Sequence, residues 1–320
     1  MDFNQYKWNI SFQAQNQINE IEILKKVFEK LPLPEPEIQI IRKRFFLNSA
    51  VSSAQVENIP STIQSPRREG KNLELAYKWI YANHDLPELS VDIIKNLHFR
   101  AMTGLSGSAG QFRNEPWGVF NEGGTEIHHA PLHTLLPQLV KQLSSYINNL
   151  NDHPVIKSTV SQFIFEKIHP FADGNGRTGR LISFYLLHKS SYDFGGLVSI
   201  EKYINKNRGL YYQALEPSHN CSLFIDFFLD AIISQANQTL EELKNPLPDT
   251  YKSKLLPRRR ELLETIKDHP ECSFDFLHRR FMNLNPVSLH RDLKYLREQN
   301  LIDKLGSTQA VVYVAKSDIL

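Results

Sequence analysis

One run of twelve residues in the middle of the chain limits its fold more than any other segment. It occupies residues 169–180 and reads HPFADGNGRTGR. The apolar residues on both sides of it recur at the spacing of an amphipathic helix, so the run predicts a loop between two helices. These apolar positions are Val160, Phe163, Ile164 and Ile168 before the run, and Leu181, Ile182, Tyr185 and Leu186 after it.

The second half of the run has the composition of a phosphate-binding loop. Gly174 and Gly176 flank Asn175, and glycines there allow consecutive backbone N–H groups to turn toward one anion. The positive end of the dipole of the following helix strengthens such a site. Arg177 and Arg180 lie about one helical turn apart, so both guanidiniums can reach phosphate oxygens.

The first half of the run supplies an acid and a base. Asp173 alone would repel a phosphate, but a Mg²⁺ ion can bridge a carboxylate to phosphate oxygens. His169 has a side chain whose pKa is near neutrality, and it can take a proton from an attacking hydroxyl. The run therefore predicts nucleotide chemistry.

The run resembles the signature of the Fic family, H-P-F-x-[DE]-G-N-G-R-x-x-R, at every defined position. The resemblance implies a protein adenylyltransferase, which moves AMP from ATP to a Tyr, Thr or Ser hydroxyl of a protein while pyrophosphate leaves. The alternative is a structural turn with a capping Asp and two solvated arginines. That alternative explains the glycines but does not explain His169, Asp173 and the arginines together.

The same resemblance assigns roles to the residues of the signature. It implies that His169 is the general base and that Asp173 holds Mg²⁺. It also implies that Arg180 pairs with the γ-phosphate of ATP and that Arg177 supports the β/γ end. The nucleotide-binding residues would be Gly174, Asn175, Gly176, Arg177, Thr178, Gly179 and Arg180.

A second segment resembles the flap that precedes the signature in this family. The sequence GQFR at residues 110–113 matches a G-x-[FY]-R pattern, and a short hairpin beside the active site would follow it. In the family this hairpin lines the nucleotide and docks the target segment. A metal site at His128, His129 and His133 is the alternative, but the spacing matches no strong zinc pattern. The flap residues would be Thr125, Glu126, Ile127, His128 and His129.

An aromatic residue after the signature is a candidate contact for adenine. The sequence NRGLYY at residues 207–212 resembles a stretch that often follows the signature, and it nominates Tyr211. Ordinary helix packing of this tyrosine is the alternative. The nearby SHNC at residues 218–221 departs from the family's common Gly-Asp-Trp pattern, which leaves the adenine pocket undefined.

A short motif in a predicted helix upstream of the signature is the next feature. The sequence SAQVEN at residues 53–58 resembles the family's inhibitory motif, [ST]-x-x-x-E-[GN], within a helix expected at about residues 45–59 and ended by Pro60. The resemblance implies that Glu57 pairs with Arg180 in place of the γ-phosphate. A solvated helix glutamate is the alternative.

The C-terminal segment predicts a second, smaller domain. From Lys252 onward the chain has 13 Lys and Arg against 9 Asp and Glu. Its expected order of helices and a terminal hairpin resembles a winged helix-turn-helix, which can bind DNA. The alternative is a protein-docking or dimerising module. Candidate DNA contacts are Ser288, His290, Arg291 and Lys294.

We therefore expect a mainly α-helical protein: a Fic-type helical core with a small β-hairpin flap, followed by a small α+β winged-helix domain. The expected boundaries are 1–105 for an N-terminal helical region, 106–248 for the catalytic core and 249–320 for the winged helix, after a Pro-containing linker at 245–249. No apolar stretch approaches the ~20 residues of a membrane span, and no secretory signal is visible. Two distant cysteines, Cys221 and Cys272, favour a reducing cytoplasm.

Several functions stay open within this interpretation. The chain could transfer a different phosphoryl-containing group, or Glu57 could position a water that removes AMP from a modified protein. In another class, it could be a DNA-binding regulator whose Fic half senses nucleotide. The expected cofactor is Mg²⁺ with ATP as substrate. The expected partners are a target protein, the chain itself and, through the second domain, DNA; a homodimer is open and no membrane partner is expected.

Overall fold

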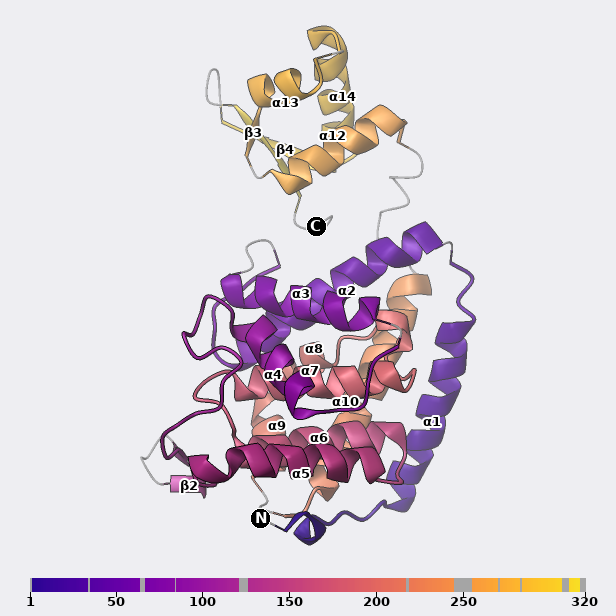
Figure 1. Cartoon of the computed structure of the whole chain (residues 1–320). Helices are drawn as coiled ribbons and strands as arrows, with labels where there is room; N and C mark the ends of the chain where they lie inside the picture. The colour runs from indigo at the N-terminus through magenta and orange to yellow at the C-terminus, as the bar shows by residue number, and fades with distance from the viewer. Residues whose placement is uncertain are drawn as a thin grey trace. The chain divides into compact units, whose positions relative to one another are not determined.

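The computed structural model of the chain describes residues 2–33, 35–63, 67–83, 85–120, 126–216, 219–244, 255–269, 271–282, 284–306 and 311–316. The chain divides into two compact units, Met1–Thr239 and Leu240–Leu320 (Figure 1). The linker predicted at residues 245–249 lies outside the described residues. The predicted boundary at residues 105 and 106 does not separate two units, because helices before and after it pack in one core.

The larger unit is mainly α-helical, as predicted. Its long helices are α1 (Phe12–Glu29), α2 (Glu35–Val56), α3 (Arg68–Ala82), α4 (Val91–Met102), α5 (Leu136–Asn149), α6 (Pro154–Ile168), α7 (Asn175–Lys189) and α10 (Ser222–Lys244). The short ones are η1 (Phe3–Gln5), η2 (His133–Leu135), η3 (Phe194–Gly196), α8 (Ile200–Lys206) and α9 (Arg208–Leu215).

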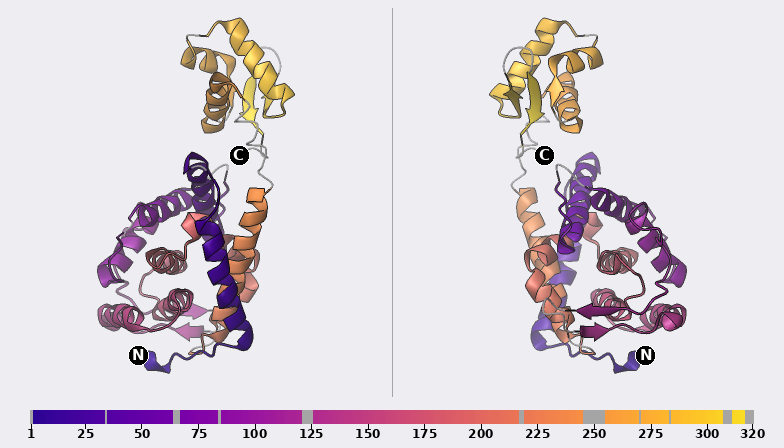
Figure 2. Two further views of the ribbon diagram at one scale, coloured as in Figure 1. Left: turned by 90° about the vertical axis from the view of Figure 1, so that its right-hand side faces the viewer. Right: turned by 90° about the vertical axis from the view of Figure 1, so that its left-hand side faces the viewer.

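The centre of this unit is the pair α6 and α7, which the signature loop (residues 169–174) connects (Figures 1 and 2). Most residues of both helices are buried, as expected of helices that are covered on all sides. α7 also contacts α2, α3 and α4. The signature loop is thus fixed at both ends by the most buried helices of the protein.

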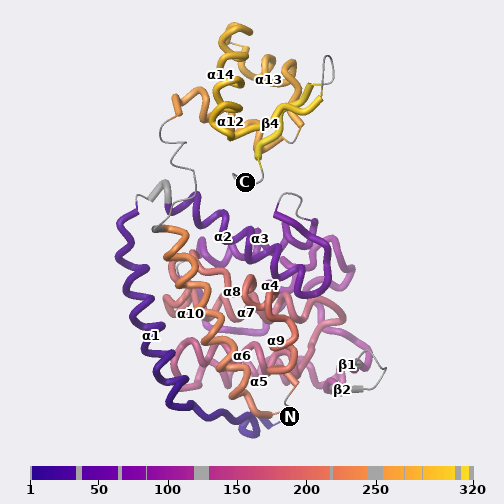
Figure 3. Tube along the Cα trace, turned by 180° about the vertical axis from the view of Figure 1, so that it is seen from behind, coloured from indigo at the N-terminus to yellow at the C-terminus, as the bar shows by residue number. Residues whose placement is uncertain are grey.

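Other helices cover this centre. α1 and α10 lie side by side (Figure 3), and Gln17 of α1 donates a hydrogen bond to Asp230 of α10 at 2.6 Å. Ser11 and Ser90 cap α1 and α4 by accepting backbone N–H groups of the first turn, which satisfies donors that a helix start leaves unpaired.

The helix that leads to Glu57 begins and ends earlier than the predicted 45–59. The sequence suggested a start near residue 45, but α2 begins at Glu35 and ends at Val56. Pro36 lies in the first turn of α2. A proline there costs little, because the N–H that it lacks has no partner within the helix.

The predicted hairpin is present between α4 and α5. Strand β1 (Gly118–Phe120) pairs antiparallel with β2 (Glu126–His129), with Gly118 opposite His129 and an irregularity after Val119. Thr125, the first of the predicted flap residues, lies outside the described residues.

In the residues that the structure describes, the smaller unit combines α-helices with a three-stranded antiparallel sheet. Its elements are α12 (Pro257–Asp268), β3 (Cys272–Ser273), α13 (Phe274–Arg280), α14 (Pro286–Glu298), β4 (Ile302–Leu305) and β5 (Val312–Ala315), with the strand order β3-β5-β4. The unit has its own core, in which Leu262, Leu289 and Leu293 are buried. The assignment of this unit as a winged helix-turn-helix stays a prediction.

Ser273 caps α13, and Asn285 with Pro286 begins α14. No described helix in either unit is both long and apolar enough to cross a membrane.

Candidate active site

Two residues in the left-handed conformation shape the signature loop. His169 (φ 48°, ψ 60°) ends α6, and its N–H donates to Phe165 O at 3.0 Å. Gly174 (φ 77°) precedes the first residue of α7. A positive φ suits glycine but is uncommon for a histidine, so contacts around the loop must hold the backbone of His169 in place.

The side chain of Asn175 fastens the loop from within. It accepts a hydrogen bond from Phe171 N–H at 2.9 Å and donates one to Phe171 O at 2.7 Å. Asn175 is buried, so its amide group stabilises the loop and its backbone N–H is what remains for an anion. Thr178 has a similar role, because its hydroxyl donates to Gly174 O at 2.8 Å.

Asp173 and Arg177 form an ion pair at the edge of the loop. Arg177 Nη2 lies 2.7 Å from Asp173 Oδ1, which also accepts the N–H of Gly174 at 2.6 Å. The carboxylate side chain is 67% exposed, whereas that of Arg177 is 5% exposed. Asp173 therefore presents a carboxylate to solvent beside the start of α7.

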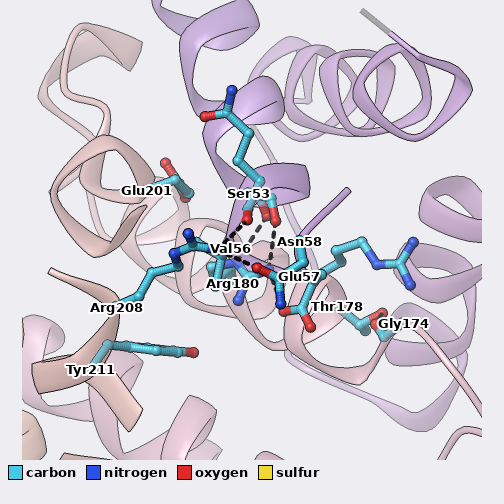
Figure 4. Close-up of polar contacts among 12 residues, drawn as sticks. Ser53, Val56, Glu57, Asn58, Gly174, Thr178, Arg180, Glu201, Arg208 and Tyr211 are labelled. Atoms are coloured by element: carbon cyan, nitrogen blue, oxygen red, sulfur yellow. Dashed lines mark hydrogen bonds and ion pairs between the residues drawn. The ribbon is translucent and has the colours of Figure 1, made fainter. Parts of the chain in front are cut away.

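Arg180 lies under the end of α2, where it meets both ends of the predicted inhibitory motif (Figure 4). Its Nε donates to Ser53 Oγ at 2.8 Å and its Nη2 donates to Ser53 O at 2.9 Å. Nη2 also lies 2.9 Å from Glu57 Oε1. The ion pair that the sequence predicts between Glu57 and Arg180 is therefore present.

Gly176 makes room for the Glu57 carboxylate. A Cβ atom at Gly176 would lie 2.3 Å from Glu57 Oε1 and 3.2 Å from Arg180 Nη1. Any larger residue would thus displace the glutamate. Glu57 occupies space directly above the first turn of α7, where the sequence predicts phosphate binding.

Side chains of α8 and α9 hold the end of α2 in this position. Arg208 Nη1 donates to Gln55 O at 2.9 Å and to Asn58 Oδ1 at 2.7 Å. Tyr212 donates to Val56 O at 3.2 Å. Asn58 has a left-handed backbone (φ 57°), so α2 ends in a tight turn right after Glu57.

A second acidic residue lies beside Arg180. Glu166 of α6 is half-buried, but its Oε1 is fully buried and accepts no hydrogen bond among the described residues. Burial, and next the negative charge of Glu57, raise the pKa of Glu166 to about 8. Burial is the largest single influence on the pKa of Arg180 and lowers it, but the charge and hydrogen bond of Glu57, together with Tyr211 and Glu166, outweigh burial and raise this pKa. One Arg180 nitrogen, Nη1, also has no hydrogen-bond partner in this part of the chain.

Tyr211 is placed in the core. It is 1% exposed, and its hydroxyl accepts a hydrogen bond from Gln162 Nε2 at 2.8 Å. Burial raises its pKa. Tyr211 therefore lies near Arg180, but its ring is packed in the core. This is the ordinary helix packing that the sequence left open as the alternative to an adenine contact. Gly179 of α7 faces Glu166: a Cβ atom at this glycine would lie 2.6 Å from Glu166 Oε1.

His98 of α4 is a loop contact that sequence reasoning missed. Gly110 N–H donates to its Nδ1 at 2.8 Å, so Nε2 carries the hydrogen and donates to Asp173 O at 2.9 Å. The ring is stacked on Phe171 with centroids 3.6 Å apart. Burial lowers the pKa of His98 to about 4, so the ring is neutral. A lone histidine in an apolar stripe gave no signal that could have found this role.

The flap begins next to His169. Trp117 precedes β1, and its ring is nearly parallel to that of His169, with centroids 6.0 Å apart. Of the flap residues predicted from sequence, the backbones of Glu126, Ile127, His128 and His129 form β2. Within the described part of the chain, no three His, Cys, Asp or Glu side chains gather as a metal site.

Comparison with known proteins agrees with this fold. Residues 88–187, which include α4, the flap, α6 and the signature, match the model of the Fic/DOC family. Residues 88–187 of this chain are therefore similar to the Fic/DOC family domain.

Curated relatives are similar over part of their length. The chain is 31% identical over 163 residues to "Protein adenylyltransferase Fic" of Drosophila erecta, which covers 49% of this chain and 31% of that protein. It is 24% identical over 202 residues to "Protein adenylyltransferase fic-1" of Caenorhabditis elegans, which covers 59% of this chain and 36% of that protein. The chain thus spans about a third of the length of these relatives.

Solved structures share the fold. A Fic family protein from Desulfovibrio desulfuricans G20 has a TM-score of 0.65 at 20% identity and covers 97% of both chains. Fic-1 from Caenorhabditis elegans has a TM-score of 0.58 at 16% identity and covers 72% of both chains.

Proposed function

We propose that this chain is a protein adenylyltransferase that moves AMP from ATP to a Tyr, Thr or Ser hydroxyl of a protein, including itself. The single observation that carries the proposal is the pairing of Arg180 with Glu57 over the first turn of α7. A buried guanidinium whose partner reaches it from another helix, 123 residues away in sequence, is the arrangement expected where a phosphate and a carboxylate compete. The names of the curated relatives support the same activity.

In the proposed reaction, His169 removes the proton from the target hydroxyl. The hydroxyl oxygen attacks the α-phosphorus of ATP, the bond from that phosphorus to the β-phosphate bridge breaks, and pyrophosphate leaves with its electrons. The backbone N–H groups at the start of α7 and the guanidiniums of Arg177 and Arg180 stabilise the charge on the phosphates.

Asp173 is the residue that would hold Mg²⁺. Its carboxylate is exposed beside the start of α7, and Mg²⁺ sites commonly use one or two carboxylates together with substrate phosphates and water. The residues present therefore fit this ion. When bound, Mg²⁺ would supply positive charge that offsets the repulsion between Asp173 and the phosphates.

Glu57 is proposed to inhibit the transfer. Its carboxylate pairs with the guanidinium that the γ-phosphate would use, and the two anions cannot occupy that place together. The contacts of Arg208 and Tyr212 with the end of α2 support a stable inhibited state.

Incubation of the purified protein with α-labelled ATP and Mg²⁺ tests the proposal. We expect weak self-labelling by the natural chain and strong labelling by Glu57→Gly. The alternatives that the sequence leaves open give other results. A hydrolase would release AMP from a pre-labelled protein and lose that activity in Glu57→Gly, and another phosphoryl transferase would leave a mass increment other than AMP.

DNA binding by the smaller unit is a second candidate function. His290, Arg291 and Lys294 are exposed along α14, and Arg279 and Arg280 are exposed on α13. Basic side chains on a helix of this kind can neutralise DNA phosphates. The full chain should then bind duplex DNA with an affinity that falls steeply as salt rises. Absence of binding at low salt would favour the docking or dimerising module.

A further inference from the structure

Arg113, in the segment between α4 and the flap, is a buried cation with neutral partners. It is 5% exposed, and its partners among the described residues are backbone carbonyl oxygens. Burial lowers its pKa, which reflects the cost of removing a charge from water. A buried guanidinium of this kind indicates that its hydrogen-bond partners require its positive charge or its planar set of donors.

Two donors of Arg113 hold the turn that carries His169. Its Nε donates to His169 O at 2.9 Å, and its own backbone N–H donates to Pro170 O at 3.0 Å. His169 has a left-handed backbone, which costs free energy unless neighbouring groups enforce it. Arg113 therefore fixes the peptide groups on the C-terminal side of the histidine in the one conformation that turns α6 into the loop.

The remaining donors of Arg113 hold both ends of the flap. Nη1 donates to Glu115 O at 2.7 Å, three residues before β1, and Nη2 donates to Pro131 O at 2.5 Å, two residues after β2. Trp117, between Glu115 and β1, faces the His169 ring. One planar guanidinium thus connects three carbonyl groups from the histidine turn and from the two ends of the hairpin.

We propose that Arg113 is a positioning residue that couples the flap to His169, so that a target segment docked on the flap sets the orientation of the imidazole. This inference rests on the proposed transfer reaction. Lysine cannot replace arginine here, because an ammonium group on a flexible stem does not reproduce three donors in a fixed plane. Arg113 touches no reacting atom; its effect passes through the backbone of His169 and the base of the flap.

The test compares Arg113→Lys and Arg113→Gln with Arg42→Lys, all in a Glu57→Gly background. Arg42 is a matched control, because its Nε also donates to a backbone carbonyl, Gly195 O at 2.7 Å, outside the loop and the flap. We expect both Arg113 variants to lower kcat for self-labelling by about 10²-fold, with KM for ATP changed by less than about twofold, since no phosphate contact is lost. Arg42→Lys should change neither parameter.

Backbone hydrogen exchange supplies a second measurement that does not require activity. In Arg113→Lys, exchange should accelerate together in peptides that cover residues 114–120, 129–132 and 168–172, and in none of these in Arg42→Lys. Acceleration in the flap peptides alone, or kcat equal to that of the parent, would overturn the coupling. If the Glu57→Gly parent does not label at all, the proposed function fails, and hydrogen exchange alone decides whether Arg113 couples the two segments.

Discussion

The larger unit buries the guanidinium of Arg180 and the smaller unit buries the carboxylate of Asp292, and the hydrogen-bond partners of these two charges differ. In the smaller unit, Asp292 of α14 is 0% exposed, and its two oxygens accept hydrogen bonds from Arg258 Nε and Arg259 Nε at 2.6 and 2.7 Å. In the larger unit, the buried Arg180 pairs with Glu57, but its Nη1 has no partner in the described structure, nor has Glu166 Oε1.

The difference separates a structural ion pair from a site that can exchange partners. Native proteins satisfy nearly all buried polar groups, so each exception calls for an explanation. Around Asp292 the partners come from the first turn of α12 in the same unit and leave neither oxygen without a hydrogen bond. The acidic partner of Arg180 is Glu57, which follows the last residue of α2 and whose side chain is 31% exposed. The unpartnered Nη1 of Arg180 lies at the place where a phosphate is expected.

The strongest test of this contrast is His169→Ala, which should abolish catalysis without weakening the fold. We expect transfer to fall by about 10²–10⁴-fold, the typical contribution of a general base, while ATP binding and Tm change little. Self-labelling and calorimetric ATP binding measure the two effects. Transfer at the natural rate would remove His169 from the mechanism.

Asp292→Ala should give the opposite result. It removes the buried acceptor of two arginines, whose side chains are 43% and 17% exposed and can turn to water; the loss of these hydrogen bonds typically costs about 1–3 kcal/mol. We expect the smaller unit to unfold at lower denaturant concentration, as followed by circular dichroism, while the transfer rate of Glu57→Gly with Asp292→Ala equals that of Glu57→Gly alone. A reduced rate would mean that the Asp292 pair also serves catalysis.

Glu57→Gly should raise transfer with a small effect on stability. Coupling between two sites is typically about 1–3 kcal/mol, which corresponds to about 5- to 150-fold in productive ATP occupancy. The gain should disappear when Arg180→Ala is added. Equal labelling by the natural chain and Glu57→Gly would make Glu57 a surface residue without inhibitory effect.

Glu166→Gln should change how stability depends on pH. The pKa of Glu166 is about 8 in the folded protein, against an ordinary value of 4.5. The contribution of Glu166 to the free energy of unfolding is therefore fully present below pH 4.5, and it is lost as the pH rises through 8. Between these values the natural chain should lose up to about 1.4 kcal/mol per pH unit relative to Glu166→Gln. Melting curves at pH 5, 6.5 and 8 measure this difference; parallel curves would show that Glu166 ionises as in water.

Local patterns were sufficient for most of the fold. Helical spacing of apolar residues predicts α6 and α7 with the loop between them, and both helices are present. The start of α2 was predicted ten residues too late; Pro36 lies in its first turn, which tolerates a proline. The exact first residue of a helix is therefore harder to predict from sequence than the presence of the helix.

The sequence by itself determined the helix–loop–helix and the signature residues, because they lie in a short segment whose residue types and spacing restrict the chemistry. The pairing of Glu57 with Arg180 was expected only from the resemblance of residues 53–58 to the inhibitory motif of the Fic family. Only the tertiary structure decided the roles of His98, Arg113 and Glu166. These residues contact backbone carbonyl groups or charges of segments that are distant in sequence. Because every residue has a backbone carbonyl, the sequence does not indicate which of them such a side chain will contact. Burial likewise decided the environment of Tyr211, since packing depends on which helices cover a side chain and not on its own type.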